Sequence, residues 1–205
     1  MRKAALFGGT FDPIHLGHTT VAQAACQQLG AEKIIFVPAK RSPLKKSGPV
    51  ADDEHRLAMI TLAIEDKGIF EVSDYELRRP EPSYTLQTVK HFQEVLGQDV
   101  ELHWLLGADS LAELLHWYGI LELIDRCRLT TMYRAGYPKP DFGKYTALLG
   151  PDRVARLQSD IVETPLVDIS STEVRRRLAA GEDVSAMLHP AVAEYIKKHN
   201  LYADE

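Results

Sequence analysis

Short apolar segments alternate with longer segments of helical periodicity, and this alternation limits the possible folds more than any other feature of the chain. Strands are predicted at residues 4–7, 33–37, 70–74, 102–106, 128–133 and 160–163. Helices are predicted between and after them, at residues 14–29, 53–65, 84–96, 110–117, 172–180 and 191–199. Strands separated by helices are typical of βα units. The sequence therefore predicts an α/β fold, a Rossmann-like doubly wound parallel sheet with helices on both faces.

The chain is expected to form a single domain. Its 205 residues contain no repeat and no low-complexity segment that would mark a boundary. We predict one domain over residues 1–205, with a C-terminal helical part from about residue 170 to 205. Residues 141–153 contain glycine, proline and lysine, and are expected to form a surface excursion.

Composition and charge argue against several classes of protein. The formal net charge of −5 supplies no basic field for nucleic acid or an anionic membrane. The chain has no signal segment and no run of about 18 apolar residues, so no membrane association is expected. Cys26 and Cys127 lack CxxC or histidine spacing, which indicates reduced thiols, no metal site and a cytoplasmic protein. The composition is compatible with a homo-oligomer.

The string GGTFDPIHLGH, residues 8–18, has the residue types of a phosphate site and is called the phosphate motif below. Gly8 and Gly9 allow a sharp turn and close approach of a ligand to the main chain. Pro13 is tolerated at the start of the following helix, whose N–H groups and dipole favour anions. His15 and His18 are three residues apart and should share one face of the first turn. The alternative is a glycine-rich turn followed by surface histidines.

A second motif, ISSTEVR at residues 169–175, combines hydroxyls and a cation at a predicted helix start. Ser170 or Ser171 is expected to cap that helix. Arg175 lies in its first turn, where a guanidinium can bind phosphate oxygens bidentately. The alternative is a capping box with a solvated arginine.

Residues 38–46 form a basic loop with four cations between two prolines and Gly48. Lys45 or Lys46 could neutralise phosphates if the loop closes as a lid, and a solvated loop is the alternative. The strings GxGxxG and GxxxxGK[ST] are absent, which removes the main support for a dehydrogenase or a P-loop kinase.

The two motifs resemble the (T/H)xGH and ISSTxIR signatures of the nucleotidylyltransferase superfamily, whose members cut a nucleoside triphosphate between its α and β phosphates. The resemblance implies ATP binding by Gly8, Gly9, Thr10, Phe11, His15, His18, Asp109, Ile169, Ser170, Ser171 and Arg175. It implies catalytic roles for His15, His18, Lys45 and Arg175. Lys45 takes its role from its position in the basic loop, where Leu44 replaces a histidine common in the family.

Two further strings, PSYTLQT at residues 82–88 and GADSL at 107–111 followed by Trp117, resemble the bacterial nicotinate-nucleotide adenylyltransferase family. The resemblance implies backbone donors near Thr85 for the nicotinate carboxylate and stacking of Trp117 on the pyridine ring. Asp109 would bind ribose, or alternatively cap the next helix. A tryptophan packed in the core is the alternative for Trp117, and Trp104 is expected to be such a residue.

Tyr84 and Asp12 complete the predicted nicotinate-nucleotide site. The resemblance implies an enzyme that joins ATP and nicotinate mononucleotide to give deamido-NAD and pyrophosphate. Mg²⁺ would accompany ATP, and no protein ligand for it can be named. The alternatives are another acceptor, such as nicotinamide mononucleotide or phosphopantetheine, a nucleotide-binding regulator without activity, and a nucleic-acid-binding module.

Overall fold

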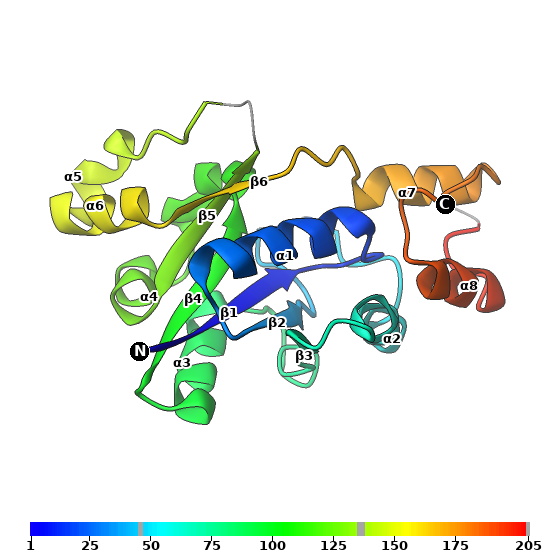
Figure 1. The fold of residues 1–205 in the computed structure, drawn as a ribbon, viewed down its shortest axis with the longest axis horizontal. Coiled ribbons are helices and arrows are strands. Elements are labelled where there is room, and N and C mark those ends of the chain that lie inside the picture. Colours follow the sequence, from blue (N-terminus) through cyan, green and yellow to red (C-terminus); the bar gives the residue numbers. More distant parts are fainter. Residues whose placement is uncertain (45–46, 135–137, 204–205) are drawn as a thin grey trace.

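The computed structural model describes residues 1–44, 47–134 and 138–203. In this part of the chain, six parallel strands form one sheet in the order β3-β2-β1-β4-β5-β6 (Figure 1). The strands are β1 (Arg2–Gly9), β2 (Lys33–Pro38), β3 (Phe70–Val72), β4 (Val100–Gly107), β5 (Arg128–Arg134) and β6 (Ile161–Thr164). All six predicted strands are confirmed, with ends that differ by a few residues.

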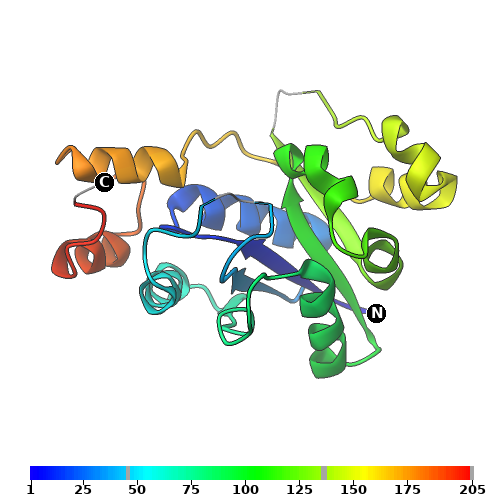
Figure 2. The same cartoon turned by 180° about the vertical axis from the view of Figure 1, so that it is seen from behind.

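Helices cover both faces of the sheet, which confirms the doubly wound fold. On one face lie α1 (Leu16–Leu29) and α2 (Asp53–Ile64). On the other lie α3 (Thr85–Leu96), α4 (Ile120–Arg126) and α6 (Pro151–Ser159), and α3 and α4 face the viewer in Figure 2. Each face has its own apolar core. Strand β1 is continuously apolar from Ala4 to Phe7 because both of its faces are buried. Ala5 and Phe7 enter one core, and Ala4 and Leu6 enter the other.

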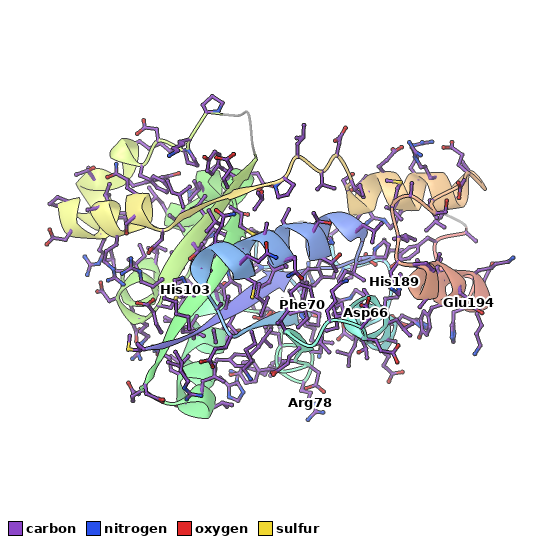
Figure 3. All side chains as sticks on the ribbon, viewed as in Figure 1. Asp66, Phe70, Arg78, His103, His189 and Glu194 are labelled. Carbon is purple, nitrogen blue, oxygen red and sulfur yellow. The ribbon has the colours of Figure 1, made fainter. Side chains whose placement is uncertain are left out.

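The C-terminal helices α7 (Ser171–Ala179) and α8 (Pro190–Lys198) lie beyond one end of the sheet. Glu194 on α8 lies at one end of the molecule, well away from His103 on β4 (Figure 3). Val174 and Ile196 nevertheless belong to the same buried cluster as Ile14 and Met59. Because this core continues from the sheet into the C-terminal helices, we propose that the chain folds as one domain.

The start of α1 differs from its prediction. The helix begins at Leu16, and Pro13 lies in a turn before it, joined to Asp12 by a cis peptide bond. Pro13 therefore does not occupy the first helical position, and His15 is the N-cap residue. The segment expected as a helix at residues 110–117 is the 3₁₀ helix η1 (Ala108–His116).

The expected surface excursion at residues 141–153 is wrong. This segment forms the 3₁₀ helix η2 (Gly143–Tyr145), the short helix α5 (Thr146–Leu149) and the start of α6. Phe142, Tyr145 and Leu149 are buried in the core shared with α3 and α4. Apolar residues spaced three and four apart carried this signal, because they form one face of a helical path.

Gly8 is required by packing at the junction of β1 and β4. A Cβ atom on Gly8 would lie 2.2 Å from Cζ2 of Trp104, and one on Gly9 would lie 2.8 Å from Cζ of Phe11. Trp104 is buried, as predicted for a core residue. Packing therefore accounts for both glycines before any ligand is considered.

Replacement of Gly8 by alanine is expected to lower the free energy of unfolding by about 1–3 kcal/mol, because the new methyl group overlaps the indole of Trp104. Urea denaturation followed by circular dichroism measures this loss. Gly68→Ala is the matched control, since a Cβ atom there meets nothing within 4 Å. Equal losses in the two variants would contradict the packing argument.

Candidate active site

A cleft of about 1280 Å³ opens at the carboxyl ends of β1, β4 and β5. The strand order reverses between β1 and β4, and doubly wound sheets bind ligands at such a switch point. Every predicted binding residue that the structure describes lines this cleft: Gly8, Gly9, Thr10, Phe11, Asp12, His15, His18, Tyr84, Thr85, Asp109, Trp117, Ile169, Ser170, Ser171 and Arg175. Lys45 and Lys46 lie outside the described residues, and Leu44 before them lines the cleft.

The two histidines of the phosphate motif are stacked. Their ring centroids are 3.7 Å apart with an interplanar angle of 24°, and the backbone N–H of His15 donates to Nδ1 of His18 at 3.3 Å. This geometry confirms that both rings share one face at the start of α1. It also places them where the N–H groups of the first helical turn favour an anion.

His15 is held as a neutral imidazole. Its side chain is 7% exposed, and burial lowers its pKa to about 4. Its Nδ1 atom is buried and has no hydrogen-bond partner within the described part of the chain. A buried ring with an unused polar atom is costly unless a ligand satisfies it. An anionic ligand beside His15 would raise its pKa.

The second motif is bonded directly to the phosphate motif. Ser170 is the N-cap residue of α7 and accepts from the N–H of Glu173 at 3.2 Å. The hydroxyl of Ser171 donates to the carbonyl of Pro13 at 3.0 Å. Nη1 of Arg175 donates to the carbonyl of Asp12 at 2.8 Å. Ser170 thus caps the helix as predicted, while Ser171 and Arg175 bring the two motifs together.

The carboxylate of Asp12 accepts hydrogen bonds from two other segments of the chain. Oδ2 accepts from the N–H of Val50 at 2.6 Å, and Oδ1 accepts from the N–H of Ala51 at 3.1 Å. The hydroxyl of Tyr202 donates to Oδ1 at 2.7 Å. These donors use the carboxylate, and the side chain is only 3% exposed. This geometry argues against the nucleotide-binding role predicted for Asp12, whose carboxylate instead joins three segments of the chain.

Arg56 on α2 is a supporting residue that the sequence analysis did not identify. Its side chain is fully buried, and Nη1 donates to the carbonyl of Thr10 at 2.7 Å while Nη2 pairs with Asp53. It therefore holds the phosphate motif from behind. Arg56 lies three and four residues before Met59 and Ile60 on the buried face of α2. That spacing was the signal available in the sequence.

The strings at residues 82–88 and 107–117 form the far wall of the cleft. Tyr84 is the N-cap residue of α3, and Thr85 begins the helix, where backbone N–H groups lack acceptors within the helix. The ring centroids of Tyr84 and Tyr118 are 4.7 Å apart. Trp117 is half-buried and packs against the core of this face. Tyr118 was not predicted, although it neighbours Trp117 and lines the cleft.

Two carboxylates also lie on this wall. Asp109 is exposed in the first turn of η1, whose N-cap residue is Gly107, so the alternative that Asp109 caps the helix is wrong. Glu76 was not predicted, although it lines the cleft. It is buried and accepts a hydrogen bond from the hydroxyl of Thr88. Burial raises the pKa of Glu76.

The sheet order and the cleft are those of a Rossmann-like nucleotidyltransferase. The cytidylyltransferase-like family matches residues 6–177. A protein of Dehalococcoides mccartyi named "Probable nicotinate-nucleotide adenylyltransferase" is 40% identical over 202 residues, 98% of this chain and 97% of its own. One of the same name from Rhodopirellula baltica is 36% identical over 96% of this chain and 92% of its own. The chain therefore belongs to the cytidylyltransferase-like family and, within it, to the nicotinate-nucleotide adenylyltransferases.

Solved structures share the fold. The nicotinic acid mononucleotide adenylyltransferase of Plasmodium falciparum complexed with NaAD matches with a TM-score of 0.76 and 20% identity, over 100% of this chain and 99% of its own. A putative nicotinate-nucleotide adenylyltransferase of Vibrio parahaemolyticus matches with a TM-score of 0.67 and 20% identity, over 100% and 98%.

The described residues contain neither a metal-binding cluster nor a membrane-spanning helix. Residues 1–44, 47–134 and 138–203 contain no group of three or more histidine, cysteine, aspartate or glutamate side chains placed to hold a metal ion. In the same ranges, no helix combines the length and the apolar character that crossing a membrane requires.

The lowered pKa of His15 predicts a pH-dependent stability. Between the ordinary pKa of 6.5 and the folded value of about 4, the unfolded chain binds more protons at this position than the folded chain. The free energy of unfolding therefore does not depend on the titration of His15 above pH 6.5. Below that pH it decreases, by about 3 kcal/mol in total, as the pH falls to 4.

Urea unfolding of the wild type and of His15→Gln between pH 4 and 8 measures this contribution as a difference. We expect the wild type to lose more stability than the variant as the pH falls. His116→Gln, at an exposed histidine, is the control and should follow the wild type. A difference between wild type and His15→Gln that is constant with pH would contradict the prediction.

Proposed function

We propose that this chain is an adenylyltransferase that joins ATP and nicotinate mononucleotide to give deamido-NAD and pyrophosphate in NAD biosynthesis. The observation that carries the proposal is that the phosphate motif, the second motif and the segments around Thr85 and Trp117 line one cleft. The relatives named as nicotinate-nucleotide adenylyltransferases support it over nearly the whole chain.

The reaction needs positioning and charge stabilisation. The 5′-phosphate of the acceptor is already an anionic nucleophile, so its oxygen attacks the α-phosphorus of ATP directly and pyrophosphate leaves. His15 and His18 hold the phosphates and stabilise the charge that develops on the departing group. Arg175 assists from the second motif, and the glycine-rich turn with Thr10 and Phe11 supplies further contacts. Lys45 keeps its predicted role as a phosphate-binding cation.

The opposite wall of the cleft binds the acceptor. Backbone N–H groups near Thr85 receive the nicotinate carboxylate, because the start of α3 presents the positive end of the helix dipole. The indole of Trp117 stacks on the electron-poor pyridine ring, with Tyr84 beside it. Asp109 is exposed just after β4 and accepts from the ribose hydroxyls of ATP. Ile169 and Ser170 lie on the ATP side.

We propose that Mg²⁺ enters with ATP. The side chains around the phosphate motif are imidazoles, hydroxyls and a guanidinium, while the carboxylate of Asp12 is used by backbone donors and Tyr202. This donor set fits a cation carried mainly by phosphate oxygens and water. When bound, the ion neutralises phosphate charge and polarises the reacting group.

We further propose that the protein works in the cytoplasm on small molecules. The buried free thiols Cys26 and Cys127 support a reducing compartment. Both substrates are small anions, and the cationic side of the cleft suits their phosphates.

The first test is pyrophosphate release with Mg-ATP and one acceptor at a time: nicotinate mononucleotide, nicotinamide mononucleotide or phosphopantetheine, with each product identified by mass. We expect a strong preference for nicotinate mononucleotide, because only its carboxylate carries the charge that the N–H groups at Thr85 favour. Preference for another acceptor would retain the phosphate chemistry and overturn the acceptor. No product with any acceptor would overturn the proposed activity.

Loss of His18 is expected to lower kcat about 10²-fold or more with little change in stability, because its ring serves the phosphates. Steady-state kinetics and thermal unfolding of His18→Ala test this expectation. His91→Ala on α3 is the control, since His91 stacks on Tyr75 and does not line the cleft. Unchanged turnover, or unfolding of the His18 variant, would contradict the assignment.

A further inference from the structure

The segment after α8 is bonded to the phosphate motif through one buried contact. The hydroxyl of Tyr202 donates to Oδ1 of Asp12 at 2.7 Å, across 190 positions of sequence. Tyr202 is 6% exposed and Asp12 is 3% exposed, so water does not substitute easily for either partner. Burial beside the Asp12 carboxylate raises the pKa of Tyr202 well above its ordinary range. The phenol therefore stays protonated and remains a donor at neutral pH.

Asp12 also accepts hydrogen bonds from segments on both sides of the cleft entrance. Its carboxylate accepts from the N–H groups of Val50 and Ala51, which follow the basic loop and precede α2. Its carbonyl accepts from Arg175, and the next carbonyl, of Pro13, accepts from Ser171. The orientation of Asp12 thus affects the position of the phosphate motif, of the second motif, and of Val50 and Ala51, which are called the anchor of the basic loop below.

The backbone on both sides of the contact is constrained. Phe11, just before Asp12, has φ 48°, and Tyr202 has φ 63°. Residues other than glycine adopt this left-handed region at a cost that surrounding contacts must offset. Phe11 is 2% exposed and packs against Phe7, Phe36 and His18. The hydrogen bond between Tyr202 and Asp12 joins these two constrained segments and therefore favours one backbone arrangement of the phosphate motif.

We propose that Tyr202 is a positioning residue for ATP, which acts through Asp12 to hold the phosphate motif and the anchor of the basic loop in their binding arrangement. This inference rests on the proposed function, because it takes the phosphate motif as the ATP site. A phenylalanine at position 202 would fill the same space but leave Oδ1 of Asp12 without its hydroxyl donor. The hydroxyl, more than the ring, is therefore the positioning element.

The chain offers a matched control. The hydroxyl of Tyr195 on α8 lies 3.0 Å from Nδ1 of His55, and this bond also ties the C-terminal part to α2. Tyr195 does not line the cleft, and its bond does not involve the phosphate motif. Tyr195→Phe and Tyr202→Phe each remove one hydroxyl from a bond between the C-terminal part and an earlier segment, which is α2 for Tyr195 and the phosphate motif for Tyr202. Only the second removes a bond to Asp12.

The experiment compares the two variants in kcat, in KM for each substrate and in Tm. For Tyr202→Phe we expect kcat/KM for ATP to fall about tenfold, the size expected for one hydrogen bond to a charged group. KM for nicotinate mononucleotide should stay within twofold of the wild type, because the far wall is not bonded to Tyr202. Tyr195→Phe should retain wild-type kinetics for both substrates with a similar change in Tm.

A binding measurement separates this inference from the proposed reaction. The Kd of a non-hydrolysable ATP analogue, measured by calorimetry, should rise about tenfold in Tyr202→Phe and stay unchanged in Tyr195→Phe. Wild-type kinetics and affinity in Tyr202→Phe, equal losses for both substrates, or the same loss in Tyr195→Phe would each overturn the positioning role. A wild-type protein without adenylyl transfer would overturn the proposed function, while the analogue Kd would still test the role of Tyr202.

Discussion

Parallel pairing of β1 with β4 is the contact on which the rest of the molecule depends. β1 pairs with β2 on one side and with β4 on the other, so the direction of winding reverses at its carboxyl end. The helices that follow β1 and β4 then lie on opposite faces, and the two connections diverge to leave the cleft between them. Trp104 fills the space beside Gly8 at this junction, so the floor of the site is part of the core.

Hydrogen bonds within the chain position the phosphate motif, and burial tunes its electrostatics. Arg56 behind the motif and Arg175 beside it both donate to backbone carbonyls, so each guanidinium is oriented by the loop that it supports. The stacked histidines lie in front, with the pKa of His15 lowered by burial. A neutral imidazole that gains a proton beside an anion couples binding of the anion to uptake of a proton. This arrangement suits a reaction in which negative charge moves from one phosphate group to another.

Much of the fold and of the cleft lining was predictable because local signals carried them. The apolar runs identified all six strands, and the two motifs and two shorter strings identified residues that line the cleft. The supporting contacts were less predictable. Asp12 reads as a site residue, yet its partners Val50 and Tyr202 are 38 and 190 positions away. Residues 141–153 contain loop-forming types but are held by buried Phe142 and Leu149. The role of Asp12 depends on tertiary neighbours that no local pattern specifies, whereas in residues 141–153 the spacing of the apolar residues was a local signal that the loop-forming residue types obscured.

The bond between Asp12 and Tyr202 joins segments that are synthesised at very different times. The phosphate motif is among the first segments to leave the ribosome, whereas Ser171, Arg175 and Tyr202 are made long after it. Contacts of such separation close late, because the intervening chain must first be ordered. A nascent chain can therefore form β1 and α1 before the phosphate motif has its contacts with α7 and Tyr202. On the proposed function, ATP would meet the complete set of these contacts only after α7 and the segment that follows α8 have been made.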